Sequence, residues 1–116
     1  MNRWVVLSLL PLAAVAGEAD VLEVEVRCDA ERVCRFDVTV KHEDEGWEHY
    51  ADRWEVLTTN GEVIATRVLA HPHEHEQPFT RSLGGITLPE GVAEVRVRAR
   101  DSVHGYGGKE VTVSVP

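Results

Sequence analysis

Basic residues are scarce in this chain of 116 residues. Lys and Arg number 12 against 20 Asp and Glu, which gives a net charge of −8 with neutral histidines. A protein that neutralises nucleic-acid phosphates needs a basic stripe, so nucleic acid is not an expected partner. The acidic balance favours cationic partners or metal ions instead.

A hydrophobic run long enough to span a membrane is also missing. The apolar stretch at residues 4–16 has 13 residues, whereas a membrane-spanning helix needs about 20. It ends in Ala14-Val15-Ala16, a small-x-small pattern typical of signal-peptidase sites, and a second possible cut follows Ala19. We therefore expect residues 1–19 to be a signal peptide and the mature protein to be periplasmic or secreted. No cysteine stands at the junction, so a lipoprotein-type anchor is not indicated.

Cysteine is limited to Cys28 and Cys34. An even count in an exported protein predicts a disulfide. Alternating apolar residues flank both cysteines, which would place the sulfurs across the neck of a β-hairpin. The C-x-x-C spacing of thiol oxidoreductases is absent, so we expect a structural bridge.

Helical periodicity is absent as well, and short alternating segments separated by turn residues replace it. On the first segment we expect Leu22, Val24, Val26 and Cys28 to share one face, and Asn60-Gly61 predicts a hairpin turn. Residues 20–116 are expected to form about seven strands, with 79–83 and 86–88 as separate short ones. This pattern is typical of an immunoglobulin/fibronectin type III-like antiparallel β-sandwich.

All six histidines fall in the expected loops or at strand ends. His71, His73 and His75 alternate, and an extended backbone would direct three imidazoles to one side. Such a triplet can chelate zinc or copper. The alternative is three solvated histidines in a polar loop.

His42 and His49 lie in an acidic, aromatic stretch that runs from His42 to Asp52. Its carboxylates can hydrogen-bond to the far side of metal-bound imidazoles; they are Glu43, Asp44, Glu45, Glu48 and Asp52. Trp54 matches the parity of a buried strand. Trp47 and Tyr50 are instead expected to line a pocket or a partner surface.

Asp101 continues the inward parity of the strand expected at 92–101, and His104 follows three residues later. This spacing allows a structural hydrogen bond in the turn. It equally allows two metal ligands from one loop.

Some of these residues resemble the iron site of desulfoferrodoxin-type superoxide reductases. The motifs are Glu48-His49-Tyr50, Trp54-Glu55-Val56 and His104-Gly105, over about residues 36–106. The resemblance implies an immunoglobulin-like sandwich with several loop histidines and one cysteine ligand. Asp101 stands where that cysteine would be, so the thiolate that the redox chemistry uses is missing.

Two further resemblances concern the scaffold. The layout is similar to the sandwich subunits of bacterial sulfur-oxidation carrier complexes, which implies a partner-binding module. Residues 49–116 resemble a small family of secreted bacterial sandwich proteins without assigned function, which implies the fold and no chemistry.

The sequence offers no nucleophile elbow and no glycine loop preceding a helix. We therefore expect an exported binding module rather than an enzyme, with zinc, copper or iron as its ligand. The candidate ligands are His49, His104, His71, His73, His75, His42 and Asp101. The alternatives are a metal-free interaction domain that uses Trp47 and Tyr50, and a superoxide-reductase-like redox protein.

Overall fold

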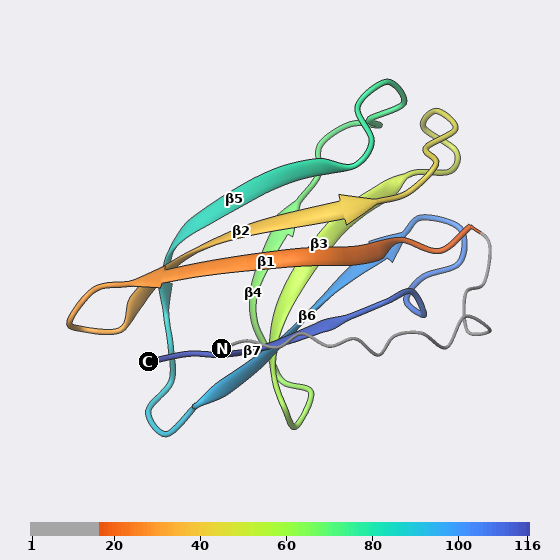
Figure 1. Cartoon of the computed structure of the whole chain (residues 1–116). Helices are drawn as coiled ribbons and strands as arrows, with labels where there is room; N and C mark the ends of the chain where they lie inside the picture. The colour runs from red at the N-terminus through yellow and green to blue at the C-terminus, as the bar shows by residue number, and fades with distance from the viewer. Residues whose placement is uncertain (1–16) are drawn as a thin grey trace.

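Residues 17–116 fold into seven strands arranged in two sheets. The computed structural model describes residues 17–116, so the apolar run of the expected signal peptide lies outside the described residues. The strands are β1 (Asp20–Cys28), β2 (Val33–Lys41), β3 (Ala51–Thr58), β4 (Val63–Val68), β5 (Phe79–Thr87), β6 (Glu94–Asp101) and β7 (Val111–Ser114). One antiparallel sheet has the order β1-β2-β5 and the other β4-β3-β6-β7 (Figure 1). The predicted antiparallel sandwich is confirmed.

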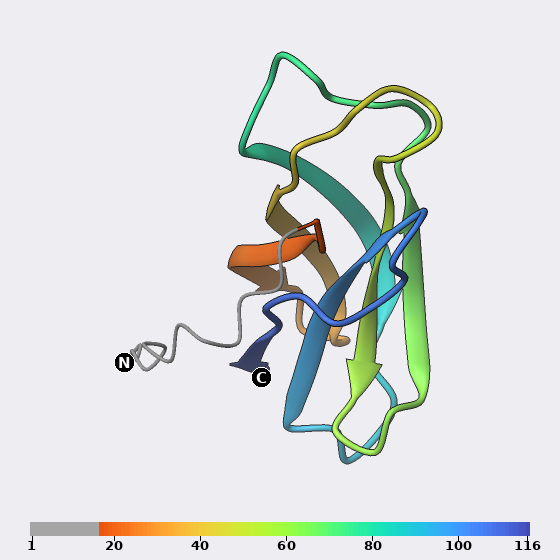
Figure 2. The ribbon, with the colours of Figure 1, turned by 90° about the vertical axis from the view of Figure 1, so that its right-hand side faces the viewer.

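The core lies between the two sheets, which Figure 2 shows as separate layers. Alternate residues of β2 and β6 point inward, so that Phe36, Val38, Val95 and Val97 are all fully buried. Trp54 is also 0 % exposed, which confirms the prediction from its parity. Removing aromatic and branched side chains from water is the main favourable term for a domain of this size.

The segment around Gly84-Gly85 corrects one expectation. Residues 79–83 and 86–88 were expected to form two short strands, but β5 runs without a break from Phe79 to Thr87. The register with β2 shifts here, and the two glycines lie opposite the single residue Arg35. A β-bulge absorbs the extra residue, and the positive φ of 68° at Gly85 is one that glycine adopts without strain.

A second irregularity changes which residues of β1 face the core. The register with β2 shifts between Val21 and Glu23. Val21 is consequently fully buried and Leu22 is exposed, so the prediction that Leu22 shares the inward face of Val24 and Val26 is wrong. A shift of one residue turns the preceding side chains to the opposite face.

The predicted disulfide joins Cys28, the last residue of β1, to Cys34 on β2. The two residues are direct register partners in the antiparallel pair. The predicted turn at Asn60-Gly61 is also formed, since the Gly61 N–H donates to the Thr58 carbonyl. Local turn and pairing chemistry therefore defines both hairpins as expected.

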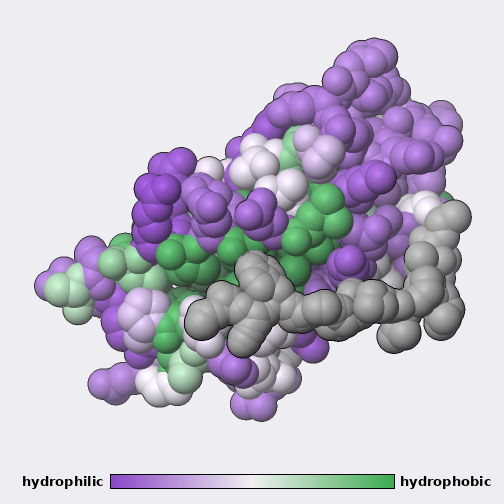
Figure 3. All heavy atoms as spheres, in the orientation of Figure 1, coloured by the Kyte–Doolittle hydropathy of each residue, from purple (hydrophilic) through white to green (hydrophobic). Residues whose placement is uncertain are grey.

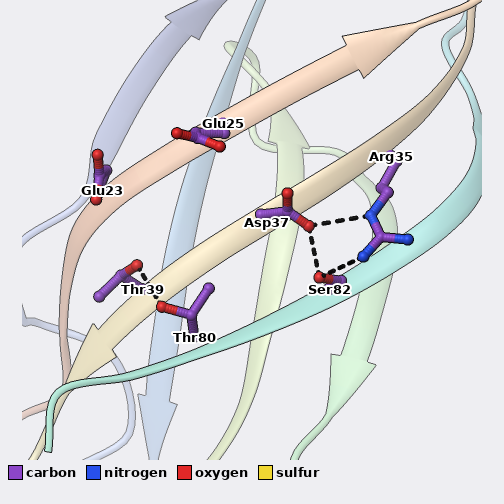
Figure 4. A pocket seen from close by; sticks show the side chains of 7 residues that line it. All are labelled: Glu23, Glu25, Arg35, Asp37, Thr39, Thr80 and Ser82. Atoms are coloured by element: carbon purple, nitrogen blue, oxygen red, sulfur yellow. Dashed lines mark hydrogen bonds and ion pairs between the residues drawn. The ribbon is translucent and has the colours of Figure 1, made fainter.

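Charged side chains cover the outer faces of both sheets. On β6, Arg98 pairs with Glu55 at 2.9 Å and Arg100 with Asp52 at 2.5 Å. The arginine-rich strand is thus a paired, solvated face rather than an anion-binding strip. On the other sheet Asp37 accepts hydrogen bonds from Arg35 and Ser82 in a shallow polar hollow (Figure 4).

Hydrophilic residues dominate the end of the sandwich that carries the β2–β3 and β4–β5 loops (Figure 3). We call this loop end the polar end of the domain. Separately, residues 17–116 contain no helix with the length and hydropathy of a membrane span.

Replacing Cys28 and Cys34 together by alanine should lower the free energy of unfolding by about 2 kcal/mol. The bridge closes a short loop, and its loss returns that loop-closure entropy to the unfolded chain. Urea unfolding followed by circular dichroism measures the change. Wild-type protein reduced with dithiothreitol should match the variant, and an unchanged unfolding midpoint would contradict the argument.

Candidate functional site

Strand pairing brings three separate segments together at the polar end. Asp20 at the start of β1 pairs with Lys41 at the end of β2, so the segment before β1 lies beside His42. Ala51 at the start of β3 pairs with Asp101 at the end of β6. The segment before β1, the β2–β3 loop and the β6–β7 loop therefore meet above one edge of the core (Figure 1).

Two imidazoles converge on one carboxylate oxygen. Nε2 of His42 and Nε2 of His49 both contact Oδ2 of Asp101, the latter at 2.7 Å. One ligand atom from each of these three residues lies within 4.8 Å of the other two. The backbone carbonyl of Gly17 joins them, 2.9 Å from Nε2 of His42 and 3.3 Å from Nε2 of His49.

On the side away from the centre, Nδ1 of each imidazole contacts a carboxylate. Nδ1 of His42 lies 2.5 Å from Oδ1 of Asp44, and Nδ1 of His49 lies 2.8 Å from Oε1 of Glu45. A carboxylate accepts, so a proton on either Nδ1 is donated to the neighbouring carboxylate oxygen. These contacts fix the orientation of both rings and leave Nε2 as the atom directed to the centre.

Asp44 connects this arrangement to the neighbouring loop. Besides the His42 ring, its carboxylate accepts hydrogen bonds from the N–H of Ala51 at 3.1 Å and of His73 at 2.6 Å. The Asp44 side chain is fully buried. Because a buried carboxylate is stable only when its oxygens are paired, these partners hold the β2–β3 and β4–β5 loops against each other.

The centre of the cluster needs a positive charge between its nitrogen and oxygen atoms. With protons on both Nδ1 atoms, neutral rings present Nε2 lone pairs to Oδ2 of Asp101 and to the Gly17 carbonyl. Lone pairs in contact repel one another unless a positive charge lies among them. Either additional protons on the Nε2 atoms or a metal cation satisfies this arrangement.

Asp101 is the anchor of the cluster and is 0 % exposed. Its Oδ1 accepts hydrogen bonds from the backbone N–H groups of Val103 at 2.6 Å and His104 at 2.7 Å. Burial alone would raise the pKa of Asp101. The His104 and Val103 amides and the rings of His42 and His49 outweigh burial and lower the pKa to about 2.

The pKa of His49 shifts in the opposite direction, above its ordinary value. The hydrogen bond to Glu45 raises the pKa of His49, partial burial opposes this change, and Asp101 adds to the increase. The site therefore stabilises positive charge at this imidazole.

His104 lies at the rim of the cluster. Its ring centroid is 5.1 Å from that of His49, and its Nδ1 is 3.4 Å from Oδ1 of Asp101. The structural hydrogen bond allowed by the Asp101–His104 spacing is formed by the His104 backbone N–H. The side chain is 38 % exposed, so the imidazole remains accessible from solvent.

The triplet in the β4–β5 loop is separate from this cluster. The rings of His71 and His73 are 4.7 Å apart, but His73 is buried and stacks on Phe79 at 4.1 Å. Burial lowers the pKa of His73, and the charges of Arg81 and His71 add to this decrease. His75 is exposed, in a turn rather than an extended segment. Metal binding by this triplet stays a prediction.

The aromatic pair expected at a partner surface lies in the β2–β3 loop. Trp47 is 65 % exposed and meets the Tyr50 ring edge-on, with centroids 5.7 Å apart. The backbone of Tyr50 is hydrogen-bonded to Ser102, the residue after Asp101, so the pair lies near the cluster. Its role in binding a partner stays a prediction.

Sequence reasoning did not identify the Gly17 carbonyl, because a backbone oxygen has no residue-type signature. It included Asp44 and Glu45 among five candidate carboxylates without singling them out. The spacing from His42 to Asp44 and from Glu45 to His49 is a usable signal, since i+2 and i+4 neighbours can reach one ring in a tight loop.

Acid should destabilise the metal-free protein partly through Asp101. Its folded pKa of about 2 lies below the ordinary 3.8, so its stabilising effect is present above about pH 4 and is lost as the pH falls through 2. The expected loss is roughly 2 kcal/mol in total. Urea unfolding in EDTA from pH 5 to pH 2 measures it.

The Asp101→Asn variant should show a flatter stability profile over this range than the wild type. The exposed Glu90 provides the control variant Glu90→Gln, which should keep the wild-type slope. Equal slopes for Asp101→Asn and the wild type would contradict the assignment.

The chain is similar to one curated protein from Halomicrobium mukohataei, named "Putative lipoprotein", with 43 % identity over 96 residues. The match covers 83 % of this chain and 47 % of the relative, so the chain spans about half the length of that protein. No family model matches the chain, and no solved structure matches it. The resemblance to desulfoferrodoxin-type superoxide reductases therefore gains no support from these comparisons.

Proposed function

We propose that this protein is an exported binding module that holds one divalent metal ion at the polar end of its sandwich. His42, His49 and Asp101 would supply Nε2, Nε2 and Oδ2, and the Gly17 carbonyl would supply a fourth donor. The observation that carries the proposal is the convergence of two imidazole Nε2 atoms on the same two oxygens.

The outer hydrogen bonds support a metal-binding role for the rings. Metal-bound histidines usually donate their second N–H to a carboxylate or a carbonyl, which fixes the tautomer and raises the basicity of the ligand nitrogen. Asp44 and Glu45 make these contacts with His42 and His49. Both rings are therefore oriented for coordination before any ion arrives.

A divalent ion between the ligands avoids two charged rings side by side. Doubly protonated His42 and His49 would place two positive rings with their centroids 4.9 Å apart, and like charges at this separation repel. One divalent ion provides the same total charge between the ligands and leaves both rings neutral. The carboxylates of Asp101, Asp44 and Glu45 supply the compensating negative charge.

The geometry requires only small movements. Bonds of about 2.1 Å in a tetrahedral site put neighbouring ligand atoms roughly 3.4 Å apart. Nε2 of His49 is 2.7 Å from Oδ2 of Asp101 and 3.3 Å from the Gly17 carbonyl. Side-chain movements of up to about 1 Å would open room for an ion.

The donor atoms restrict which metal ions the site can bind. Two imidazoles and oxygen donors suit zinc, copper(II) and iron(II), whereas calcium and magnesium prefer oxygen alone. Both cysteines are engaged in the disulfide, so a thiolate-dependent site does not fit these residues. The proposal is binding, with no reaction assigned.

Export fits the remaining features. A structural disulfide is typical of proteins that fold in an oxidising compartment. The name of the Halomicrobium relative also implies export of that protein. We extend this location to the present chain together with the expected signal peptide, without choosing between periplasm and medium.

Untagged protein should bind one equivalent of zinc or copper(II) per chain. His49→Ala should weaken the binding about 100-fold or more, because it removes a ligand whose ring is already oriented. Metal content by mass spectrometry and titration calorimetry with each ion measure the effect. Asp101→Asn should weaken binding as well.

The matched control is the double variant His71→Ala, His75→Ala. Both residues are exposed and lie in the β4–β5 loop, outside the cluster. This variant should keep the wild-type affinity. Loss of binding in the double variant, with full binding in His49→Ala, would overturn the proposed site in favour of the loop triplet.

A second candidate is a metal-free interaction domain, favoured by the exposed Trp47 beside Tyr50. Aromatic residues with one accessible face are enriched at protein interfaces. The absence of stoichiometric binding for zinc, copper and anaerobic iron(II) would favour this candidate. If the loaded protein instead turned over superoxide or peroxide, the redox alternative would replace simple binding.

A further inference from the structure

Residues 17–20 are held against the β6–β7 loop. The N–H of Val21 donates to the Lys109 carbonyl at 2.8 Å, and the Lys109 N–H donates to Oδ1 of Asp20 at 2.7 Å. Ala19 is buried with 1 % exposure. These contacts fix the position of the backbone at residues 19–21 and so keep the Gly17 carbonyl at the cluster.

Glycines make this close approach possible. A Cβ on Gly17 would lie 2.7 Å from Cε1 of His104, and a Cβ on Gly108 would lie 1.9 Å from the Ala19 carbonyl oxygen. Both separations are far below van der Waals contact. Gly17 also has a positive φ of 99°, a conformation that side chains with a Cβ rarely adopt.

We propose that signal-peptide cleavage after Ala16 completes the metal site, because it gives Gly17 a free α-amino group that becomes a further ligand. This inference rests on the proposed function. It assigns Gly17 as an N,O-chelating ligand and chooses one of the two candidate cleavage sites.

The chemistry follows from the position of the carbonyl. The amine nitrogen and the carbonyl oxygen of one residue are joined through Cα and C, so they close a five-membered ring with an ion bound to both. The carbonyl already lies 2.9 Å and 3.3 Å from the two Nε2 atoms. After cleavage only its own Cα tethers the amine, so rotation about the Cα–C bond can bring it to the ion.

Cleavage after Ala19 would destroy this arrangement. It would remove the Gly17 carbonyl from the cluster and the buried Ala19 from the core edge. The new amine at Asp20 would lie at the start of β1, paired with Lys41, and outside the cluster. The structure therefore favours the Ala16–Gly17 bond as the processing site.

The test compares copper(II) binding by two forms of the protein. One begins at Gly17 with a free amine, and the other retains Ala14-Val15-Ala16 in front of it. Both contain all seven strands and every proposed side-chain ligand. The extension keeps the carbonyl and moves the free amine away by up to roughly 10 Å.

The form that begins at Gly17 should bind copper(II) about tenfold or more tightly, since the tethered amine acts at high effective concentration. Its electron paramagnetic resonance spectrum should show three coupled nitrogens, against two in the extended form. Protein exported with its own leader should have a mature mass corresponding to residues 17–116.

Equal affinities and equal nitrogen counts in the two forms would overturn the amine ligand while leaving the His/Asp site intact. A mature terminus at Asp20 would overturn the processing assignment. Failure of both forms to bind copper(II), zinc or iron(II) would overturn the proposed function itself. His49→Ala in each form should lose binding, which shows that the amine alone does not capture the metal.

Discussion

The carboxylate of Asp101 is the contact on which the polar end of the molecule depends. It is completely buried at the end of a core strand, and four groups contact its oxygens: the rings of His42 and His49 from the β2–β3 loop, and the amides of Val103 and His104 from the loop that follows it. A buried carboxylate without partners costs several kcal/mol. The loops are therefore held in one arrangement by the need to satisfy a single side chain.

Local patterns predicted most of the fold. Alternation predicted that Trp54 lies in the core, and the even cysteine count predicted the Cys28–Cys34 bridge. Asn60-Gly61 predicted the turn between β3 and β4. Each of these signals depends on residues that are neighbours in sequence. The inward direction of Asp101 followed from the same parity, and the structure confirms its burial.

The failures share a different cause. Leu22 faces solvent and residues 79–87 form one strand because the register shifts relative to a partner strand. Such a shift is a property of two paired segments, and neither segment reveals it alone. A parity assignment is reliable only as far as the next bulge.

The candidate site was likewise predicted only in part from the sequence. The sequence named His42, His49 and Asp101 among seven candidates, with His49 and His104 favoured over His71, His73 and His75, but it did not single out the three that meet. Which loop residues meet is decided by strand order and by burial, as with His73 on Phe79. The Gly17 carbonyl lay beyond any residue-type argument, because every residue has one.

The two ends of β1 are secured by different chemistry. It is an edge strand, paired on one side to β2, and several of its inward residues such as Val24 and Val26 are only partly buried. The disulfide holds its Cys28 end covalently to β2. At the other end, the Gly17 carbonyl and the Asp20 carboxylate connect it to the loops. An ion bound to Gly17 would therefore stabilise the strand as well as the site, because a ligand that binds only the folded state adds its binding free energy to folding. Metal binding and the docking of the N-terminal segment are then one equilibrium.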